Sequence, residues 1–206
     1  MLYDISPPID DRLQVWPGDE RPRREVKCRI EDGAPVTLSA LHATVHTGAH
    51  ADGPNHYGPG APGIDSVPLE RYLGPCQVVT ARVGRAERVK PSHLARMVTE
   101  KRVLLRTATY PDPAHFNTDF AAISVELVES LAARGVVLIG IDTPSVDLFD
   151  SKDLPAHKAF LRHDVSILEQ LVLKEVPDGV FELIALPLRL IGFDASPVRA
   201  VLRTIG

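Results

Sequence analysis

A run of eleven residues, 46–56, constrains this chain more than any other segment, because it combines three histidines and one aspartate with two chain-breaking sites. In one-letter code it reads HTGAHADGPNH. Imidazole nitrogens and carboxylate oxygens are ligands of zinc and of other transition-metal ions. So many donors in one short segment are difficult to explain as packing. The run therefore predicts a metal or catalytic site.

The backbone of this run must turn if its donors are to share an ion. Metal–donor distances are about 2.0–2.2 Å, whereas residues four apart in an extended strand lie about 13 Å from each other. Gly48 gives the chain freedom to curl, and the Gly53-Pro54 pair disfavours a sustained helix. We predict a strand that ends near His46, followed by a tight loop that carries the other three donors.

Length and composition indicate an ordinary globular protein. The chain is predicted to form one domain, residues 1–206, which is long enough to bury a substantial core. Hydrophobic residues make up 44% of the chain and charged residues 24%, and the net charge is −4. Such a charge offers no basic surface for nucleic acid or for an anionic membrane. The expected partners are small molecules and other copies of the same chain.

The sequence predicts neither a membrane anchor nor a secretion signal. No apolar stretch approaches the roughly 18 residues of a membrane span, and the first eight residues lack the basic start and apolar core of a signal peptide. Cys28 and Cys76 lie far apart without CxxC spacing, which argues against a zinc ribbon or a disulfide framework. We expect a cytoplasmic protein.

Short β-rich segments outnumber helical ones, which predicts a mixed α/β or α+β architecture rather than regular alternation. Strands are expected at residues 26–30, 36–45, 78–83, 103–107, 136–141 and 180–186. One helix is expected between an N-cap at Ser124 and a stop at Gly135. Two more are expected over residues 91–97 and 166–173. Residues 110–121 are predicted to form a long loop.

A second set of donors lies between residues 152 and 169. His157 follows Pro155 in an expected loop, and Glu169 falls within the helix expected over residues 166–173. His163 and Asp164 are alternatives, and Asp164 could also cap that helix. Residue type and spacing do not separate these candidates. Taken singly, the histidines outside the 46–56 run and other than His157 are interpreted as ordinary core or surface residues: His42, His93, His115 and His163.

The 46–56 run resembles the signature HxGTHxDxPxH of the cyclase family of metal-dependent hydrolases. Within that family the chain is most similar to the bacterial kynurenine formamidases, or arylformamidases. The resemblance also takes in residues 4–6, 15–18, 141–145 and 154–169. Ala49 stands where the family pattern has threonine. Because this is not a ligand position, the resemblance still implies an intact metal site.

The resemblance implies a swivelling β/β/α fold, with a mixed sheet and short helices, and a homodimer. It also implies two Zn²⁺ ions per subunit, with Mn²⁺ or another divalent ion as an alternative. The implied roles are His46, His50 and Asp52 at one ion, His157 at the second, Asp52 and Glu169 at both, and His56 as a proton shuttle.

The implied activity is metal-dependent hydrolysis of N-formyl-L-kynurenine to L-kynurenine and formate in tryptophan degradation. The sequence contains no G-x-S-x-G elbow, the feature expected of a serine-hydrolase formamidase. By resemblance Trp16 would pack against the substrate ring, although ordinary partial burial explains it equally well. Phe116 and Tyr110 are weaker candidates for the same contact.

Two alternative functions remain open at this point. One is a related metal-dependent hydrolase that acts on another aryl amide or on a cyclic amide. The other is a non-catalytic zinc-binding protein. Structural zinc sites are usually closed and rich in cysteine, whereas this donor set is rich in histidine and carboxylate with one histidine to spare. The composition of the site therefore favours catalysis.

Overall fold

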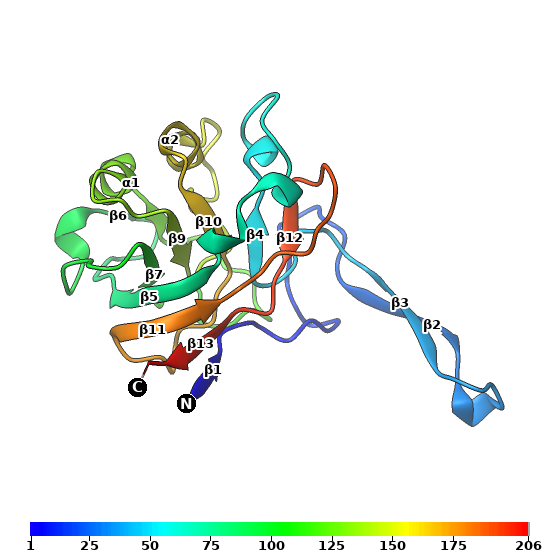
Figure 1. Ribbon diagram of the computed structural model, residues 1–206. Coiled ribbons are helices and arrows are strands. Elements are labelled where there is room, and N and C mark those ends of the chain that lie inside the picture. Colours follow the sequence, from blue (N-terminus) through cyan, green and yellow to red (C-terminus); the bar gives the residue numbers. More distant parts are fainter. Residues whose placement is uncertain (206) are drawn as a thin grey trace.

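The computed structural model describes residues 1–205, and its centre is a nine-stranded sheet with strands in both directions (Figure 1). Its strands are β1 (Leu2–Asp4), β4 (His50–Asp52), β5 (Leu73–Thr80), β7 (Arg102–Arg106), β9 (Leu138–Ile141), β10 (Ser166–Glu169), β11 (Gly179–Ile184), β12 (Ala195–Pro197) and β13 (Val201–Thr204). Their spatial order is β1-β13-β11-β5-β7-β9-β10-β4-β12. The pairs within β5-β7-β9-β10 are parallel and the others are antiparallel. The predicted mixed α/β architecture is confirmed.

Alternating side chains divide the core between the two faces of this sheet. On β7, Val103 and Leu105 face the helices, whereas Leu104 faces the opposite way. The parallel strands are buried on both faces, which explains their continuous apolar sequences. The cluster opposite the helices joins Ala51 of β4 to Leu202 of β13, near the two ends of the strand order. The sheet therefore curls around this cluster.

Two α-helices cover one face of the sheet, α1 (Val125–Ala132) and α2 (Pro155–His163) (Figure 1). The prediction for α1 is confirmed. Ser124 Oγ accepts a hydrogen bond from the backbone N–H of Leu127 at 3.1 Å, as an N-cap does. Gly135 has φ +82°, the left-handed conformation that lets the chain leave the helix.

The helix predicted over residues 166–173 is wrong. Residues 166–169 form β10, with all four side chains buried, and the helix is α2, immediately upstream. A short apolar segment fits a buried strand as well as a helix, so periodicity could not distinguish them. His157 consequently lies on a helix and Glu169 on a strand, while Asp164 ends α2 with φ +52° instead of beginning a helix.

The helix predicted over residues 91–97 is also wrong, because only Pro91–His93 form a single 3-10 turn. The backbone then becomes extended at Leu94 and pairs with the end of β5: the N–H of Ala95 donates to Thr80 O at 2.9 Å. The other 3-10 turns are Ile30–Asp32, Pro54–His56, Ile64–Ser66 and Leu69–Arg71. No helix within residues 1–205 is long and apolar enough to cross a bilayer.

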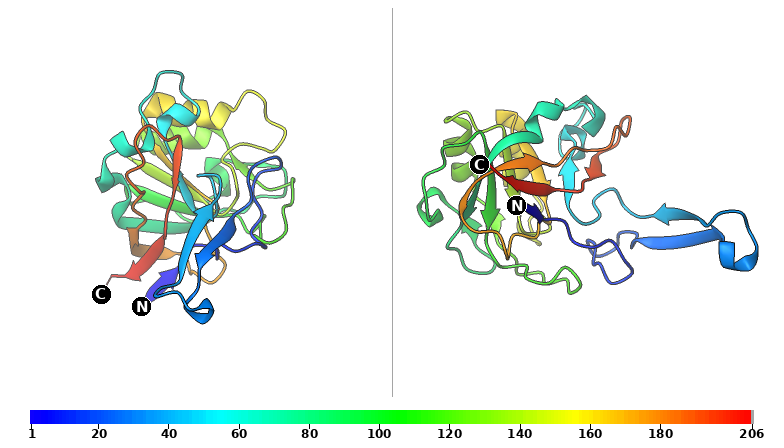
Figure 2. Two further views of the ribbon diagram at one scale, coloured as in Figure 1. Left: turned by 90° about the vertical axis from the view of Figure 1, so that its right-hand side faces the viewer. Right: turned by 60° about the horizontal axis from the view of Figure 1, so that its bottom comes forward.

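Two further strand pairs lie outside the large sheet. β6 (Arg88–Val89) and β8 (Ala122–Ile123) form a short parallel pair. β2 (Arg23–Cys28) and β3 (Leu38–His42) form a hairpin that projects from the body (Figure 2). We call residues 23–42 the arm. The strands predicted over residues 26–30 and 36–45 both lie largely in the arm, and β3 ends at His42, not near His46.

A methyl group at Gly140 is expected to destabilise the fold. A Cβ there would lie 2.5 Å from Leu104 Cδ2 and 2.9 Å from Leu171 Cδ1. Gly140→Ala should therefore lower the free energy of unfolding by about 1–3 kcal/mol, measured by chemical denaturation. Gly179→Ala is the matched control, because its nearest neighbour would be Phe181 at 3.5 Å, an ordinary contact. Equal effects of the two substitutions would contradict the packing described.

Candidate metal centre

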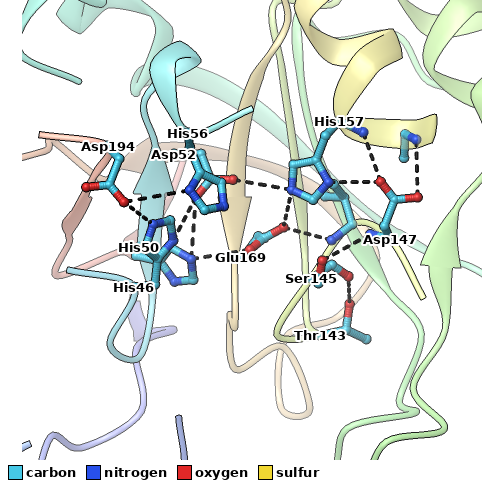
Figure 3. Close-up of polar contacts among 12 residues, drawn as sticks. His46, His50, Asp52, His56, Thr143, Ser145, Asp147, His157, Glu169 and Asp194 are labelled. Carbon is cyan, nitrogen blue, oxygen red and sulfur yellow. Dashed lines mark hydrogen bonds and ion pairs between the residues drawn. The ribbon is translucent and has the colours of Figure 1, made fainter. Parts of the chain in front are cut away.

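Strand alternation and register bring most of the predicted donors to one face of the sheet. Along β4, His50 and Asp52 point to one side, and Ala51 points into the curled core on the other. β10 runs antiparallel to β4 with Glu169 directly opposite His50, so these side chains share a face. α2 lies over that face and brings His157 to the same place (Figure 3). Contrary to the expected loop, His50 and Asp52 thus lie on a strand.

A tight turn between the arm and β4 places His46. Thr47 Oγ1 donates a hydrogen bond to Thr44 O at 2.7 Å. Gly48 has φ +61°, and a Cβ there would lie 3.3 Å from Pro7 Cγ, so both conformation and space favour glycine. The rings of His46 and His50 come within 5.0 Å of each other, centroid to centroid. The turn inferred from the 46–56 run is therefore present.

Two carboxylates lie among the imidazoles. Asp52 Oδ1 is 3.3 Å from His46 Nδ1 and 3.5 Å from His50 Nε2, while Asp52 Oδ2 is 3.7 Å from His157 Nε2. Glu169 Oε2 lies 3.2 Å from His50 Nε2, and Glu169 Oε1 lies 3.8 Å from His157 Nε2. Both carboxylates therefore connect the two sides of the cluster, a position suited to bridging two ions.

Buried polar atoms without hydrogen-bond partners mark the centre of the cluster. They are His50 Nε2 and both carboxylate oxygens of Asp52. The Asp52 side chain is fully shielded from solvent. Burial alone would raise the pKa of Asp52, but the neighbouring His157 and His46 imidazoles hold it well below its usual range. Because a buried carboxylate needs compensation, these residues fit a bound divalent cation.

In three of the histidines, one ring nitrogen contacts a hydrogen-bond acceptor and the other ring nitrogen faces Asp52. The acceptors are Asp194 Oδ2 for His46 Nε2 (3.0 Å), Gly48 O for His50 Nδ1 (2.8 Å) and Asp147 Oδ2 for His157 Nδ1 (2.8 Å). Hydrogen bonds of this kind fix the tautomer and orientation of metal-binding histidines. The three rings are therefore prepared to donate to a metal.

His56 differs from the other three histidines. Its Nδ1 lies 3.7 Å from Asp194 Oδ2, beyond hydrogen-bond distance, and its side chain is 36% exposed. Its ring is nevertheless 4.2 Å from that of His46, centroid to centroid. Burial lowers the pKa of His56 below its ordinary value. A neutral imidazole at the edge of the cluster can accept and return a proton at neutral pH.

Asp147 and Asp194 are two site residues that the sequence analysis missed. Asp147 accepts hydrogen bonds from the backbone N–H groups of Ala156 and His157 at the start of α2 and from Arg88 Nη1 at 2.7 Å. Its only sequence signal was its position six residues after the strand expected over residues 136–141. Asp194 lies 148 residues from His46, and no local pattern connects them.

A cavity of about 280 Å³ opens onto the cluster. Its lining includes His46, His56 and His157 of the cluster together with Trp16 and Phe116. Trp16 packs against Phe149 and Phe116, with ring centroids 5.0 and 5.8 Å away. Tyr110 lines a different cavity. The histidines at positions 42, 93, 115 and 163 do not line the 280 Å³ cavity.

Two strained backbone positions lie next to the elements that carry His157 and Glu169, one before α2 and one after β10. Leu154, just before α2, has φ +44°, and Gln170, just after β10, has φ +54°. Left-handed conformations cost non-glycine residues of order 1–3 kcal/mol and are concentrated at functional sites. Both residues line the same cavity. They adjoin the elements that carry His157 and Glu169.

Comparison with known proteins gives consistent matches over nearly the whole chain. A protein-family model described as Putative cyclase matches residues 3–148. A curated relative from Bordetella pertussis, named kynurenine formamidase, is 47% identical over 99% of this chain and 98% of its own length. Another kynurenine formamidase, from Polaromonas naphthalenivorans, is 45% identical over 99% of this chain and 91% of its own length. A solved structure described as a potential metal-dependent hydrolase with cyclase activity has a TM-score of 0.83 at 28% identity, covering 98% of this chain and 96% of that one.

Removing the carboxylate behind His157 should weaken metal binding. Asp147→Asn keeps the side-chain shape but replaces the acceptor of His157 Nδ1, and we expect metal affinity to fall about 10–100-fold. Competition with a chromophoric chelator measures this change. Asp178→Asn is the matched control, because Asp178 is a mostly buried carboxylate bound to Arg106 and Thr80. Equal losses of affinity in the two variants would show that Asp147 acts only through stability.

The cluster should also make metal binding depend on pH. Burial alone would lower both pKa values, but the Asp52 and Asp194 carboxylates raise the pKa of His46 to about 9, and the Asp147 and Asp52 carboxylates raise the pKa of His157 to about 10. Both imidazoles therefore carry protons at pH 7 when no metal is bound. Their contribution to stability is complete below their unfolded pKa of about 6.5 and is lost as the pH rises through 9–10.

Metal must displace these protons, so metal affinity should rise between pH 6.5 and 9 while the stability of the metal-free protein falls. Calorimetric titration in buffers of different ionisation enthalpy should show about two protons released per chain at pH 7. Release of no protons would contradict the charged state assigned to His46 and His157.

Proposed function

The chain belongs to the cyclase family, whose model covers most of its length, and on that premise we propose that it hydrolyses N-formyl-L-kynurenine to L-kynurenine and formate in tryptophan degradation. The relatives named kynurenine formamidase support this activity. The structural observation that carries the proposal is one cavity whose lining combines donors of the cluster, His56 and the aromatic side chains of Trp16 and Phe116.

The proposed cofactor is a pair of zinc ions, with Mn²⁺ or another divalent ion as the alternative. Imidazole and carboxylate donors without thiolate suit these metals. The proposed ligands are His46, His50 and Asp52 for one ion and His157 for the other, with Asp52 and Glu169 shared. When bound, such ions make water nucleophilic at neutral pH and neutralise charge that develops on a carbonyl oxygen.

His56 performs the proton transfers in this proposal. As water adds to the formyl carbon, the His56 imidazole accepts its proton. The aryl amine is a poor leaving group until it is protonated, so His56 then donates that proton to the nitrogen as the C–N bond breaks. Amide and water become amine and formic acid, which loses a proton at neutral pH to give formate. The lowered pKa of His56 supports the first transfer, because it keeps the imidazole neutral.

Trp16 and Phe116 are the proposed contacts for the aromatic ring of the substrate. Both line the cavity that contains His56, and edge-to-face packing between them fixes their relative orientation, at 83° between ring planes. A ring held against this wall would present its formyl group to the cluster. A homodimer and a cytoplasmic location complete the proposed function.

Loss of N-formylkynurenine, followed by absorbance, tests the activity and the role of His56 together. Zinc-loaded protein should turn over the substrate, and chelated protein should not. His56→Ala should lower kcat by about 10²–10⁴-fold with unchanged metal content. His163→Ala, at the end of α2 and outside the cavity, should retain activity.

Two results would contradict this proposal. Activity that survives complete metal removal would exclude the metal-dependent mechanism. Well-folded protein with two bound ions but no turnover would exclude formylkynurenine as the substrate.

A further inference from the structure

The cavity beside the metal centre contains one carboxylate that the donor cluster does not use. Two acidic residues line this cavity: Glu169, which belongs to the cluster, and Asp19, which does not. Asp19 is an exposed residue, so it lies where the cavity meets solvent. The neighbouring Glu20 pairs with Arg23 at 3.8 Å, whereas Asp19 takes part in none of the ion pairs found within residues 1–205. Its charge is therefore available to a ligand.

A single tight turn holds Asp19 beside Trp16. The backbone N–H of Asp19 donates a hydrogen bond to Trp16 O at 3.0 Å, which closes a four-residue turn. Pro17 occupies its second position, and Gly18, with φ +104°, occupies the third, as in type II turns. The Trp16 ring is packed against Phe149. The proposed ring contact and the free carboxylate therefore belong to one anchored segment.

The cavity offers no lysine or arginine of its own. None lines it within residues 1–205. The nearby Arg21 donates a hydrogen bond to Gln14 Oε1 at 2.9 Å and is not part of the lining. The histidines that line the cavity belong to the metal cluster or to the proposed proton transfer. A cationic group on a bound ligand thus meets Asp19 as the free carboxylate of this cavity.

We infer that Asp19 binds the α-ammonium group of an amino-acid substrate and so favours aryl formamides with a cationic side chain. The inference rests on the proposed function and names what distinguishes its substrate. N-formyl-L-kynurenine carries its formamide on the aromatic ring and its ammonium group at the end of a short chain on the same ring. With the ring against Trp16, the ammonium group can donate to Asp19. A cyclic aryl amide without an amine makes no such contact.

This contact should act on substrate binding and not on the chemical step. The ammonium group is remote from the C–N bond that breaks, so Asp19 stabilises the bound substrate and the transition state equally. Such uniform binding changes KM and leaves kcat unaltered. Because Asp19 is exposed, the ion pair is worth little more than other solvent-exposed pairs, about a 2–5-fold effect, and salt should weaken it.

Steady-state kinetics with two substrates test the inference on the metal-loaded protein. The second substrate is the desamino analogue of N-formyl-L-kynurenine, in which hydrogen replaces the α-ammonium group. Wild-type kcat/KM should favour N-formyl-L-kynurenine by about 2–5-fold. Asp19→Asn should raise KM for N-formyl-L-kynurenine by the same factor, with kcat unchanged, and should leave the analogue unaffected. Asp19→Lys should raise that KM further, because it repels the ammonium group, and should not raise KM for the analogue.

Asp11→Asn is the matched control, because Asp11 is an exposed aspartate of the same N-terminal segment that does not line the cavity. It should leave both substrates unaffected. A preference for N-formyl-L-kynurenine that persists in Asp19→Asn would overturn the inference. Equal losses on both substrates would also overturn it, because Asp19 would then act only through the turn.

Failure of the inference can be distinguished from failure of the proposed function. Turnover of both formamides with equal kcat/KM by the wild-type protein would overturn the recognition of the ammonium group while the formamidase activity stands. No turnover of either formamide would overturn the proposed activity, and the inference with it.

Discussion

The negative charge of Asp52, removed from water, is the constraint on which the rest of the site depends. Both of its carboxylate oxygens are buried without a hydrogen-bond partner. Such a group is strongly destabilising unless positive charge or metal ions lie beside it. The imidazoles of His46, His50 and His157 all face Asp52. The chain therefore folds around a charge that protonated imidazoles compensate in the metal-free protein and that metal ions would compensate when bound.

Strand geometry and hydrogen bonding explain the positions of the elements that surround Asp52. β4 delivers two donors because alternate residues of a strand share a face, and the antiparallel register with β10 adds Glu169. α2 is anchored at its first turn by Asp147, which also orients His157. Leu154 and Gln170, which adjoin α2 and β10, have a left-handed backbone conformation that is strained for residues other than glycine.

Local chemistry made part of this structure predictable from the sequence. The donor density of residues 46–56 indicated the site, Gly48 indicated its turn, and Ser124 with Gly135 indicated α1. The assignment around residue 166 failed because a strand buried on both faces has no alternation to distinguish it from a helix. Asp194 could not be found, because it reaches His46 only through the pairing of β12 with β4. Contacts that depend on which strands are neighbours in the sheet cannot be recognised from a short segment of sequence.

Anomalous diffraction from crystals of the zinc-loaded protein, recorded at the zinc edge, tests the central claim most directly. The account predicts two peaks inside the cluster, both within coordination distance of the Asp52 carboxylate. Full zinc loading with no peak beside Asp52 would contradict it, because the buried charge would then be compensated in some other way.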